Sequence, residues 1–225
     1  MENLNQFIEH TFLSPTGTVN DVEKVVNEAI ENNFLGVCIN PVYVDYVSKK
    51  LKPYGIKVIT VVGFPLGANL PEVKSFEAFK AVDDGADEVD MVINIGKLKQ
   101  KDYKAVTEDI KIVVECSKER PVKVILEVDF LTEDEVVEAC KCCIEGGAKF
   151  VKTSTGFAKG GVGATAKIVK LMKDTVSAHG LEVKASGGVK TTEDAINMIK
   201  AGATRIGTSS GVSIVKGLED TKSDY

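Results

Sequence analysis

The sequence predicts an α/β protein, and within that class a single (β/α)8 TIM barrel, from three observations. Short runs rich in β-branched residues recur along all 225 residues, as is typical of buried parallel strands. Amphipathic stretches lie between these runs, and such alternation indicates an α/β fold. No linker or change in composition divides the chain. We therefore expect one domain over residues 1–225, with a short flexible tail from about residue 219.

Seven strands are predicted from composition and an eighth from its position. The seven runs are 35–39, 57–62, 88–93, 122–128, 149–152, 181–184 and 204–206. A short strand at 10–13, just before the loop SPTGT and the first helix, brings the number to eight. Strands then recur roughly every 22 to 34 residues, which matches repeated βαβ units. Eight units without a break favour a closed barrel, whose typical size is about 250 residues.

The helices between these strands have recognisable faces and ends. Apolar residues at positions 19, 22, 25, 26, 29 and 30 lie on one face of the first predicted helix. Helix starts and ends are also marked: Thr132 with Glu135 and Thr191 with Asp194 fit capping boxes, Pro71 suits a first turn, and Gly85, Gly147 and Gly202 suit left-handed C-caps. An open doubly wound sheet is the rival fold, but no G-x-G-x-x-G follows the first strand.

Composition excludes several classes of protein. Hydrophobic residues make up 44% and charged residues 27%, which suits a folded core and excludes intrinsic disorder as the main state. No apolar stretch is long enough for a membrane span, and the start MENLNQFIEH is unlike a signal peptide, so we expect a cytoplasmic protein. A net charge of −5 offers no general footprint for nucleic acid or anionic membranes. Five cysteines, three of them crowded at 140, 142 and 143, indicate reduced thiols.

Three ionisable residues lie at or near the carboxyl ends of otherwise apolar strands, where barrel enzymes place their chemistry. They are Asp90 in EVDMVINIG, Lys152 in FVKTSTGF and Lys184 in VKASGGV. A surface-facing or salt-bridged residue is the alternative for either lysine taken alone. Because the two lysines lie on consecutive strands at matching positions, we favour a functional pair.

Paired lysines point to imine chemistry. An amine attacks a carbonyl only when it is neutral, and an ordinary lysine, with a pKa near 10.4, is almost wholly protonated at pH 7. A second ammonium within about 4–6 Å, together with desolvation, lowers the pKa of its neighbour. Lys184 would act in this way on Lys152, or the reverse, and Asp90 would serve as general acid and base.

The turns after the last two strands suit a phosphate group. Gly187 and Gly188 follow the seventh strand, and the segment from Gly207 through Ser209 and Ser210 follows the eighth and opens the last helix. Backbone N–H groups in such turns bind anions, and this is the usual phosphate site of barrels. Tight turns with ordinary helix caps are the alternative.

Other residues give weaker signals. His10 and His179 are the two histidines, so a metal site built from several imidazoles is not available, and we expect no metal. Cys140, Cys142 and Cys143 lack a second close cysteine pair or a histidine partner for zinc. Cys38 in GVCINP either lines the barrel mouth or is a small core residue.

Through these residues the sequence resembles the deoxyribose-phosphate aldolases, a family of class I aldolases. The motifs that carry the resemblance run through nearly the whole chain: EHTFLSPTGT, GVCINP, VVGFPLG, EVDMVINIG, FVKTSTGF, VKASGGVK and RIGTSSG. The resemblance implies a (β/α)8 barrel that reversibly cleaves 2-deoxy-D-ribose 5-phosphate into D-glyceraldehyde 3-phosphate and acetaldehyde. It implies no metal or organic cofactor, and it implies a homodimer.

The motifs also carry over roles for individual residues. The resemblance implies that Lys152 is the Schiff-base nucleophile, that Lys184 is the neighbouring cation and proton donor or acceptor, and that Asp90 is the acid and base. It implies that Thr153 lies near the reacting hydroxyls. The positions similar to the family's phosphate contacts are Gly156, Gly187, Gly188, Ser209 and Ser210.

Two positions depart from the family pattern. The usual D-H-T is here Glu9-His10-Thr11, and a lysine often found shortly afterwards is Ser14. We expect the longer Glu9 side chain to pair with Lys184 with altered geometry, which affects pKa tuning rather than reaction type. The terminal Tyr225 is either a proton relay that reaches the active site or part of a disordered end.

Two other functions remain open from the residues. One is a Schiff-base barrel aldolase that acts on a different phosphosugar. The other is a catalytically silent phosphosugar-binding barrel whose lysines only neutralise substrate charge. Substrate profiling would separate the first from the deoxyribose-phosphate reaction, and imine trapping would separate the second.

Overall fold

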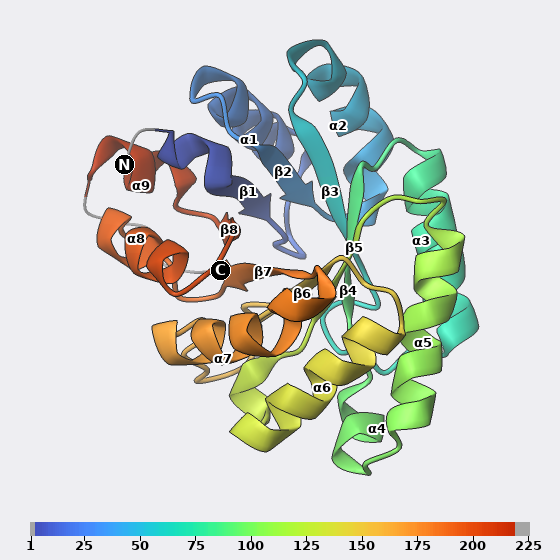
Figure 1. The fold of residues 1–225 in the computed structure, drawn as a ribbon. Coiled ribbons are helices and arrows are strands. Elements are labelled where there is room, and N and C mark those ends of the chain that lie inside the picture. The colour runs from blue at the N-terminus through green and yellow to red at the C-terminus, as the bar shows by residue number, and fades with distance from the viewer. Residues whose placement is uncertain (1–2, 219–225) are drawn as a thin grey trace.

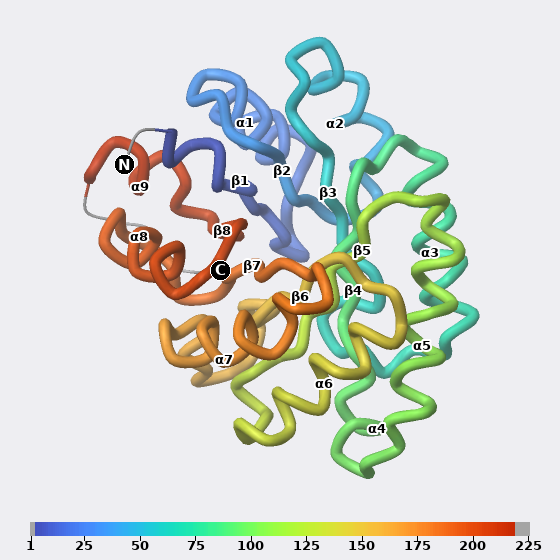
Figure 2. The backbone as a smooth tube through the Cα atoms, viewed as in Figure 1, coloured from blue at the N-terminus to red at the C-terminus, as the bar shows by residue number. Residues whose placement is uncertain are grey.

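Eight parallel strands close into a barrel in sequence order, and β8 pairs with β1 to complete it (Figure 1). The structure is a computed structural model that describes residues 3–218. Figure 2 follows the backbone as it alternates between the inner strands and the outer helices. The strands are β1 (Ile8–Phe12), β2 (Gly36–Ile39), β3 (Lys57–Val62), β4 (Glu88–Val92), β5 (Val122–Ile125), β6 (Phe150–Lys152), β7 (Glu182–Ser186) and β8 (Arg205–Thr208).

Helices follow the strands and cover the outside of the barrel. The α-helices are α1 (Val19–Glu31), α2 (Val44–Leu51), α3 (Pro71–Asp83), α4 (Ile95–Lys99), α5 (Tyr103–Cys116), α6 (Glu133–Glu145), α7 (Ala166–Val176), α8 (Thr192–Lys200) and α9 (Gly211–Lys216). Short 3-10 turns complete the connections: η1 (Leu4–Phe7), η2 (Pro41–Tyr43), η3 (Lys52–Tyr54), η4 (Val128–Phe130) and η5 (Ser177–His179).

These elements confirm the predicted closed barrel, and all eight expected strands are present. The first strand begins at Ile8 rather than at residue 10. The fifth ends at Ile125 rather than at residue 128, because Glu127 has a left-handed backbone with φ 56° and the chain then turns into η4.

The predicted helix ends are confirmed as well. Thr132 and Thr191 each form a capping box with the acidic residue three positions on, and Pro71 occupies the first turn of α3. The glycines that follow α3, α6 and α8 have left-handed φ values, which a residue with a side chain adopts only at a cost. They are Gly85, Gly147 and Gly202.

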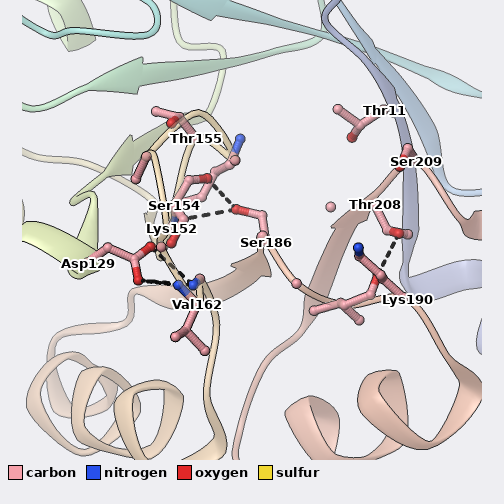
Figure 3. Close-up of a pocket in the computed structure, with 18 of the residues that line it drawn as sticks. Thr11, Asp129, Lys152, Ser154, Thr155, Val162, Ser186, Lys190, Thr208 and Ser209 are labelled. Carbon is pink, nitrogen blue, oxygen red and sulfur yellow. Dashed lines mark hydrogen bonds between the residues drawn. The ribbon is translucent and has the colours of Figure 1, made fainter. Parts of the chain in front are cut away.

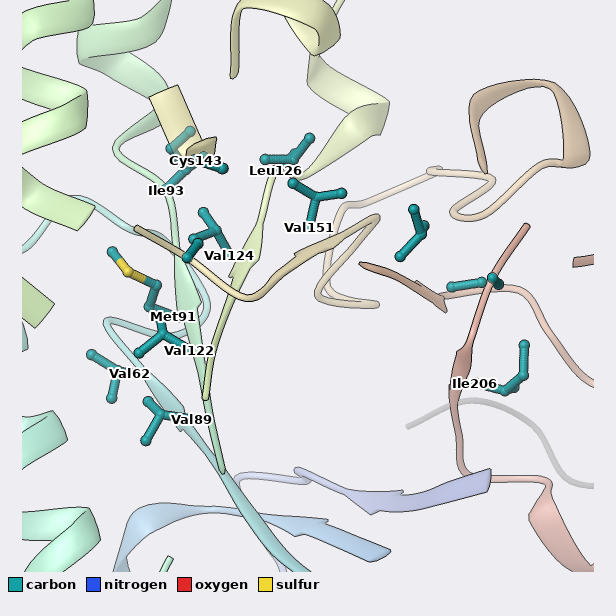
Figure 4. Packing of buried hydrophobic residues seen from close by; sticks show 14 of the residues in the cluster. Val62, Val89, Met91, Ile93, Val122, Val124, Leu126, Cys143, Val151 and Ile206 are labelled. Carbon is teal, nitrogen blue, oxygen red and sulfur yellow. The ribbon is translucent and has the colours of Figure 1, made fainter. Parts of the chain in front are cut away.

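Strand residues alternate between two buried layers. On β4 and β5, Val89, Met91 and Val124 belong to the apolar layer between the barrel and its helices (Figure 4). The residues between them, Asp90 and Lys123, are also fully buried, so they occupy the opposite face of the strands, inside the barrel. The outer layer supplies most of the hydrophobic burial.

The inside of the barrel has an apolar part and an ionic part. Cys38, Ile59 and Val61, from β2 and β3, form a small apolar cluster that is separate from the outer layer. Strand β1 and strands β4 to β7 contribute buried charged side chains instead, and β8 contributes Arg205, whose side chain is 14% exposed. Within residues 3–218, no helix combines the length and apolarity needed to cross a membrane. The predicted tail from residue 219 lies outside the described part of the chain.

Candidate active site

The strand order brings the three ionisable residues singled out in the sequence into direct contact. The Nζ atoms of Lys152 and Lys184 lie 2.8 Å and 2.7 Å from the same carboxylate oxygen, Oδ2 of Asp90. Lys152 and Lys184 are register partners on β6 and β7, which places their side chains side by side. Asp90 and Lys184 are 0% exposed, and Lys152 is 3% exposed.

A third lysine, Lys123 on β5, completes the surroundings of Asp90. Its Nζ lies 2.9 Å from Asp90 Oδ1, so that each carboxylate oxygen has its own cationic partner or partners. Lys123 Nζ also lies 2.7 Å from Glu88 Oε2 and is completely buried. The sequence analysis missed this residue, although VKVIL repeats the pattern of a lysine within a β-branched run that marked Lys152 and Lys184.

Glu9 on β1 closes the ring of charges. Its carboxylate forms the expected ion pair with Lys184, and its other oxygen lies 3.6 Å from Lys123 and 3.7 Å from Arg205 Nε. Arg205 in turn reaches Glu88 at 3.5 Å. The ionic part of the barrel interior is thus one connected network.

The pKa values of the two lysines that share Asp90 are shifted in opposite directions. Burial lowers the pKa of Lys152, and the positive charge of Lys184 lowers it further, against the effect of Asp90. Burial also disfavours the charged form of Lys184, but the carboxylates of Asp90 and Glu9 outweigh it and raise the pKa of Lys184. Burial opposes ionisation of Asp90, yet Lys123, Lys152 and Lys184 together hold its pKa well below the ordinary value.

A cavity of about 240 Å³ opens at the carboxyl ends of the strands (Figure 3). Lys152 lines it, whereas Asp90 and Lys184 are buried and absent from its lining. In Figure 3, Ser154 and Thr155 lie beside Lys152, while Lys190 and Ser209 lie across the cavity. All the predicted phosphate-binding positions line it: Gly156, Gly187, Gly188, Gly207, Ser209 and Ser210.

Two glycines of the cavity wall are required by close packing. A Cβ on Gly207 would lie 2.8 Å from Cε of Lys184, so residue 207 must lack a side chain for the Lys184 side chain to pass. Gly188 has φ 74°, and a Cβ there would lie 2.5 Å from the carbonyl oxygen of Val162. The loops after β6 and β7 therefore touch through their backbones.

Two acidic residues missed in the sequence hold the loop after β6. Asp129 lines the cavity and accepts hydrogen bonds from the backbone N–H groups of Val162 and Gly163. Glu127 accepts hydrogen bonds from the hydroxyl and backbone N–H of Thr155. Lys190 also lines the cavity and was not singled out, although it is the last residue of the VKASGGVK motif. These residues lie on loops, where strand patterning gives no signal.

The remaining predicted residues lie away from the cavity lining. Thr153 is fully buried, donates a hydrogen bond to the backbone oxygen of Ser186 at 2.7 Å and so ties β6 to β7. Cys38 is fully buried in the inner apolar cluster, and burial raises the pKa of its thiol. Tyr225 lies outside the described residues.

Within residues 3–218, no group of three or more His, Cys, Asp or Glu side chains is arranged to hold a metal ion.

Comparison with known proteins places this site within a family. The model of the DeoC/LacD family aldolases matches residues 2–217. A deoxyribose-phosphate aldolase of Carboxydothermus hydrogenoformans is 55% identical over 95% of this chain and 94% of its own. The deoxyribose-phosphate aldolase of Streptococcus uberis is 50% identical over 99% of both chains.

Solved structures agree with the sequence relatives. An aldolase named QR15 superposes with a TM-score of 0.91 and 42% identity over 96% of each chain. The deoxyribose phosphate aldolase of Aeropyrum pernix, described as tetrameric, gives a TM-score of 0.87 and 34% identity over 95% of this chain and 89% of its own. The chain described here therefore belongs to the DeoC/LacD family of aldolases.

Proposed function

We propose that this aldolase reversibly cleaves 2-deoxy-D-ribose 5-phosphate into D-glyceraldehyde 3-phosphate and acetaldehyde, through a Schiff base on Lys152 and without a metal ion or organic cofactor. The names of the relatives support the substrate. One observation carries the assignment of the nucleophile. Lys152 alone of the paired lysines faces the cavity, and its pKa is lowered whereas that of Lys184 is raised.

The charge balance of the barrel interior supports a neutral Lys152. Desolvated charges are stable only when they are compensated by opposite charges nearby. Apart from Lys152, the ionic network has four cations, Lys57, Lys123, Lys184 and Arg205, against three carboxylates, Glu9, Glu88 and Asp90. The carboxylates are therefore already compensated when Lys152 carries no proton, and a proton on Lys152 would add a further buried positive charge. This favours the neutral amine, which is the state that attacks a carbonyl.

The proposed reaction begins with attack of the Lys152 amine on the aldehyde carbon of the open-chain sugar. Loss of water from the carbinolamine gives a protonated imine, which accepts the electron pair as the bond between carbons 2 and 3 breaks. Deprotonation of the hydroxyl on carbon 3 releases D-glyceraldehyde 3-phosphate and leaves an enamine. Protonation of carbon 2 and hydrolysis then release acetaldehyde and restore Lys152.

Asp90 and Lys184 are suited to the proton transfers in this sequence. They contact Lys152 or share its carboxylate partner, so a proton has a short path between them. Lys123 acts indirectly, since it binds the Asp90 oxygen that faces away from the two other lysines. We assign it as a positioning residue that keeps Asp90 ionised and fixes its orientation.

The phosphate group of the substrate fits the far side of the cavity. Backbone N–H groups of glycine-rich turns and serine hydroxyls are suitable donors for its oxygens, and Lys190 adds a positive charge to the same wall. The positions proposed for this contact are Gly156, Gly187, Gly188, Gly207, Ser209 and Ser210. We assign Thr153 a structural role, in which its hydrogen bond to Ser186 holds together the two strands that carry Lys152 and Lys184.

Imine trapping tests this function directly. The protein is incubated with 2-deoxyribose 5-phosphate or acetaldehyde, reduced with borohydride and analysed by intact-mass and peptide mass spectrometry. We expect a single adduct on Lys152, absent in Lys152→Ala and slower in Lys184→Ala. An adduct on Lys184 would reverse the two roles. Binding of the phosphosugar without any adduct would instead indicate a silent phosphosugar-binding barrel.

A further inference from the structure

The far end of the loop after β6 is held by hydrogen bonds rather than by apolar packing. Residues 156–162 of this loop contain no buried side chain, and Val162 is 69% exposed. The carboxylate of Asp129 accepts hydrogen bonds from the backbone N–H of Val162 at 2.7 Å and from that of Gly163 at 3.1 Å (Figure 3). Hydrogen bonds to an ionised acceptor are roughly twice as strong as those between neutral groups. Asp129 therefore fixes this end of the loop.

The segment held in this way packs directly on the turn after β7. The backbone N–H of Ala164 donates a hydrogen bond to the carbonyl oxygen of Gly187 at 3.0 Å. A Cβ on Gly163 would lie 2.5 Å from the same oxygen, and a Cβ on Gly188 would lie 2.5 Å from the carbonyl oxygen of Val162. Because the two backbones are in contact, a displacement of the loop removes the support of the turn.

The charge of Asp129 does not account for its place in the cavity wall. Asp129 lines the same cavity as the glycine turns and Lys190. A carboxylate repels a phosphate group, so on charge alone it weakens the binding of a phosphosugar there. What Asp129 supplies instead is a pair of acceptor oxygens at the point where the loop after β6 meets the turn after β7.

The amine of Lys152 is held by other contacts. Lys152 ends β6 and lies 2.8 Å from Asp90, and the next residue, Thr153, bonds to the backbone of Ser186 at 2.7 Å. None of these contacts involves Asp129. Loss of the hydrogen bonds to Asp129 should therefore affect the phosphate side of the cavity and leave the amine in position.

We propose that Asp129 is a positioning residue for the phosphate group of the substrate. It binds the loop after β6 at Val162 and Gly163, and the loop in turn keeps Gly187 and Gly188 in the conformation that receives the phosphate. This inference rests on the proposed function, because it takes the turn after β7 as part of the phosphate site. It requires that the hydrogen bonds of Asp129 promote substrate binding although its charge opposes it.

The sign of the change in KM tests the positioning role. We expect Asp129→Ala to raise KM for 2-deoxyribose 5-phosphate about tenfold in steady-state assays and to leave the rate with unphosphorylated 2-deoxyribose unchanged. Removal of a negative charge alone would lower this KM. Asp134→Ala is the matched control, because it removes an exposed carboxylate from the first turn of α6 and should leave KM unchanged. An unchanged or lower KM in Asp129→Ala overturns the inference, as does an equal loss with both sugars.

Two further variants separate the hydrogen bonds from the charge. Oδ1 of Asp129 accepts from both N–H groups, so the amide oxygen of Asp129→Asn can replace it, and KM should stay within about threefold of the wild-type value. Gly161→Ala keeps the charge, but its Cβ would lie 2.7 Å from Oδ2 of Asp129 and displace the carboxylate. It should therefore raise KM as Asp129→Ala does. The reverse pattern, with a raised KM in Asp129→Asn and a wild-type KM in Gly161→Ala, contradicts the positioning role.

Two measurements that do not depend on turnover distinguish a failure of this inference from a failure of the proposed reaction. Borohydride trapping with acetaldehyde reports on Lys152 alone and should be the same in the wild-type chain and in every variant. Calorimetric titration with inorganic phosphate reports on the phosphate site alone, and Asp129→Ala should bind phosphate about tenfold more weakly. A wild-type chain that binds phosphate without forming an adduct contradicts only the reaction. Equal phosphate affinity of Asp129→Ala and the wild-type chain, or a wild-type chain that binds no phosphate, overturns the role of Asp129.

Discussion

Replacement of Lys184 by methionine tests the idea that one lysine prepares the other for attack. Lys152 and Lys184 bind the same oxygen of Asp90, at 2.8 Å and 2.7 Å. Methionine has a similar length and no charge, so the variant removes the positive charge beside Lys152. The Asp90 oxygen that the two lysines share then pairs with Lys152 alone. Both changes favour the protonated amine, and the pKa of Lys152 is expected to rise.

The size of the effect follows from the separation of the two ammonium groups. Two positive charges about 5 Å apart, at an effective dielectric constant near 20, repel each other by about 3 kcal/mol. This energy corresponds to roughly two pKa units, so the neutral fraction of Lys152 at pH 7 should fall about 100-fold. Because the amine must be neutral to attack, imine formation at pH 7 should slow by a similar factor.

The assay measures the rate of reductive trapping with acetaldehyde as a function of pH. We expect the rate profile of Lys184→Met to shift to higher pH by about two units, so that part of the lost rate returns in alkaline solution. Lys190→Met is the matched control, since it removes a cation from the cavity wall without touching Asp90. A Lys184→Met profile with the wild-type midpoint, scaled down uniformly, would refute this coupling.

Three further predictions concern the phosphate site, the acid stability and the packing. Lys190→Met should raise KM for 2-deoxyribose 5-phosphate about tenfold and leave the reaction of unphosphorylated 2-deoxyribose unchanged in steady-state assays. Lys123 holds the pKa of the buried Glu88 carboxyl at about 2, against burial, compared with 4.5 in the unfolded chain. This depressed pKa contributes about 3 kcal/mol of stability above pH 4.5, and the contribution is lost as the pH falls toward 2. The loss in free energy of unfolding caused by Glu88→Gln, measured by urea unfolding, should therefore be smaller at pH 3 than at pH 7. Gly207→Ala should displace the Lys184 side chain and lower kcat at least tenfold, and an unchanged kcat would show that the lysine accommodates the added methyl group.

The barrel and its eight strands were predictable because strand composition and helix caps repeat with every unit. Where boundaries were wrong, a local backbone feature intervened, as at Glu127, whose left-handed conformation ends β5 early. A β-branched run such as VILEV carries no information about such a turn. Propensity therefore locates the strands, and the exact ends depend on the tertiary structure.

The central charges were only partly predictable. Asp90, Lys152 and Lys184 stood out as charged residues at or near the predicted carboxyl ends of apolar strands, whereas Glu88 is the first residue of β4 and Lys123 the second residue of β5. A sequence does not show that these two side chains point inward and meet 2.7 Å apart, because this depends on barrel closure and register. Asp129 was missed for a different reason, since its role is to bind backbone N–H groups of a distant loop.

The ionic network inside the barrel also restricts how this sequence can change over evolutionary time. Each charge in it compensates at least one other that has no access to water, so loss of one member leaves a buried charge unbalanced. The effects of substitutions in this network on the free energy of unfolding are therefore strongly non-additive. A change in sequence that keeps the protein folded requires that paired charges be exchanged together. By the same logic, a substitution at Glu9 that keeps the carboxylate, such as Glu9→Asp, preserves the charge balance and changes only the reach of the side chain toward Lys184.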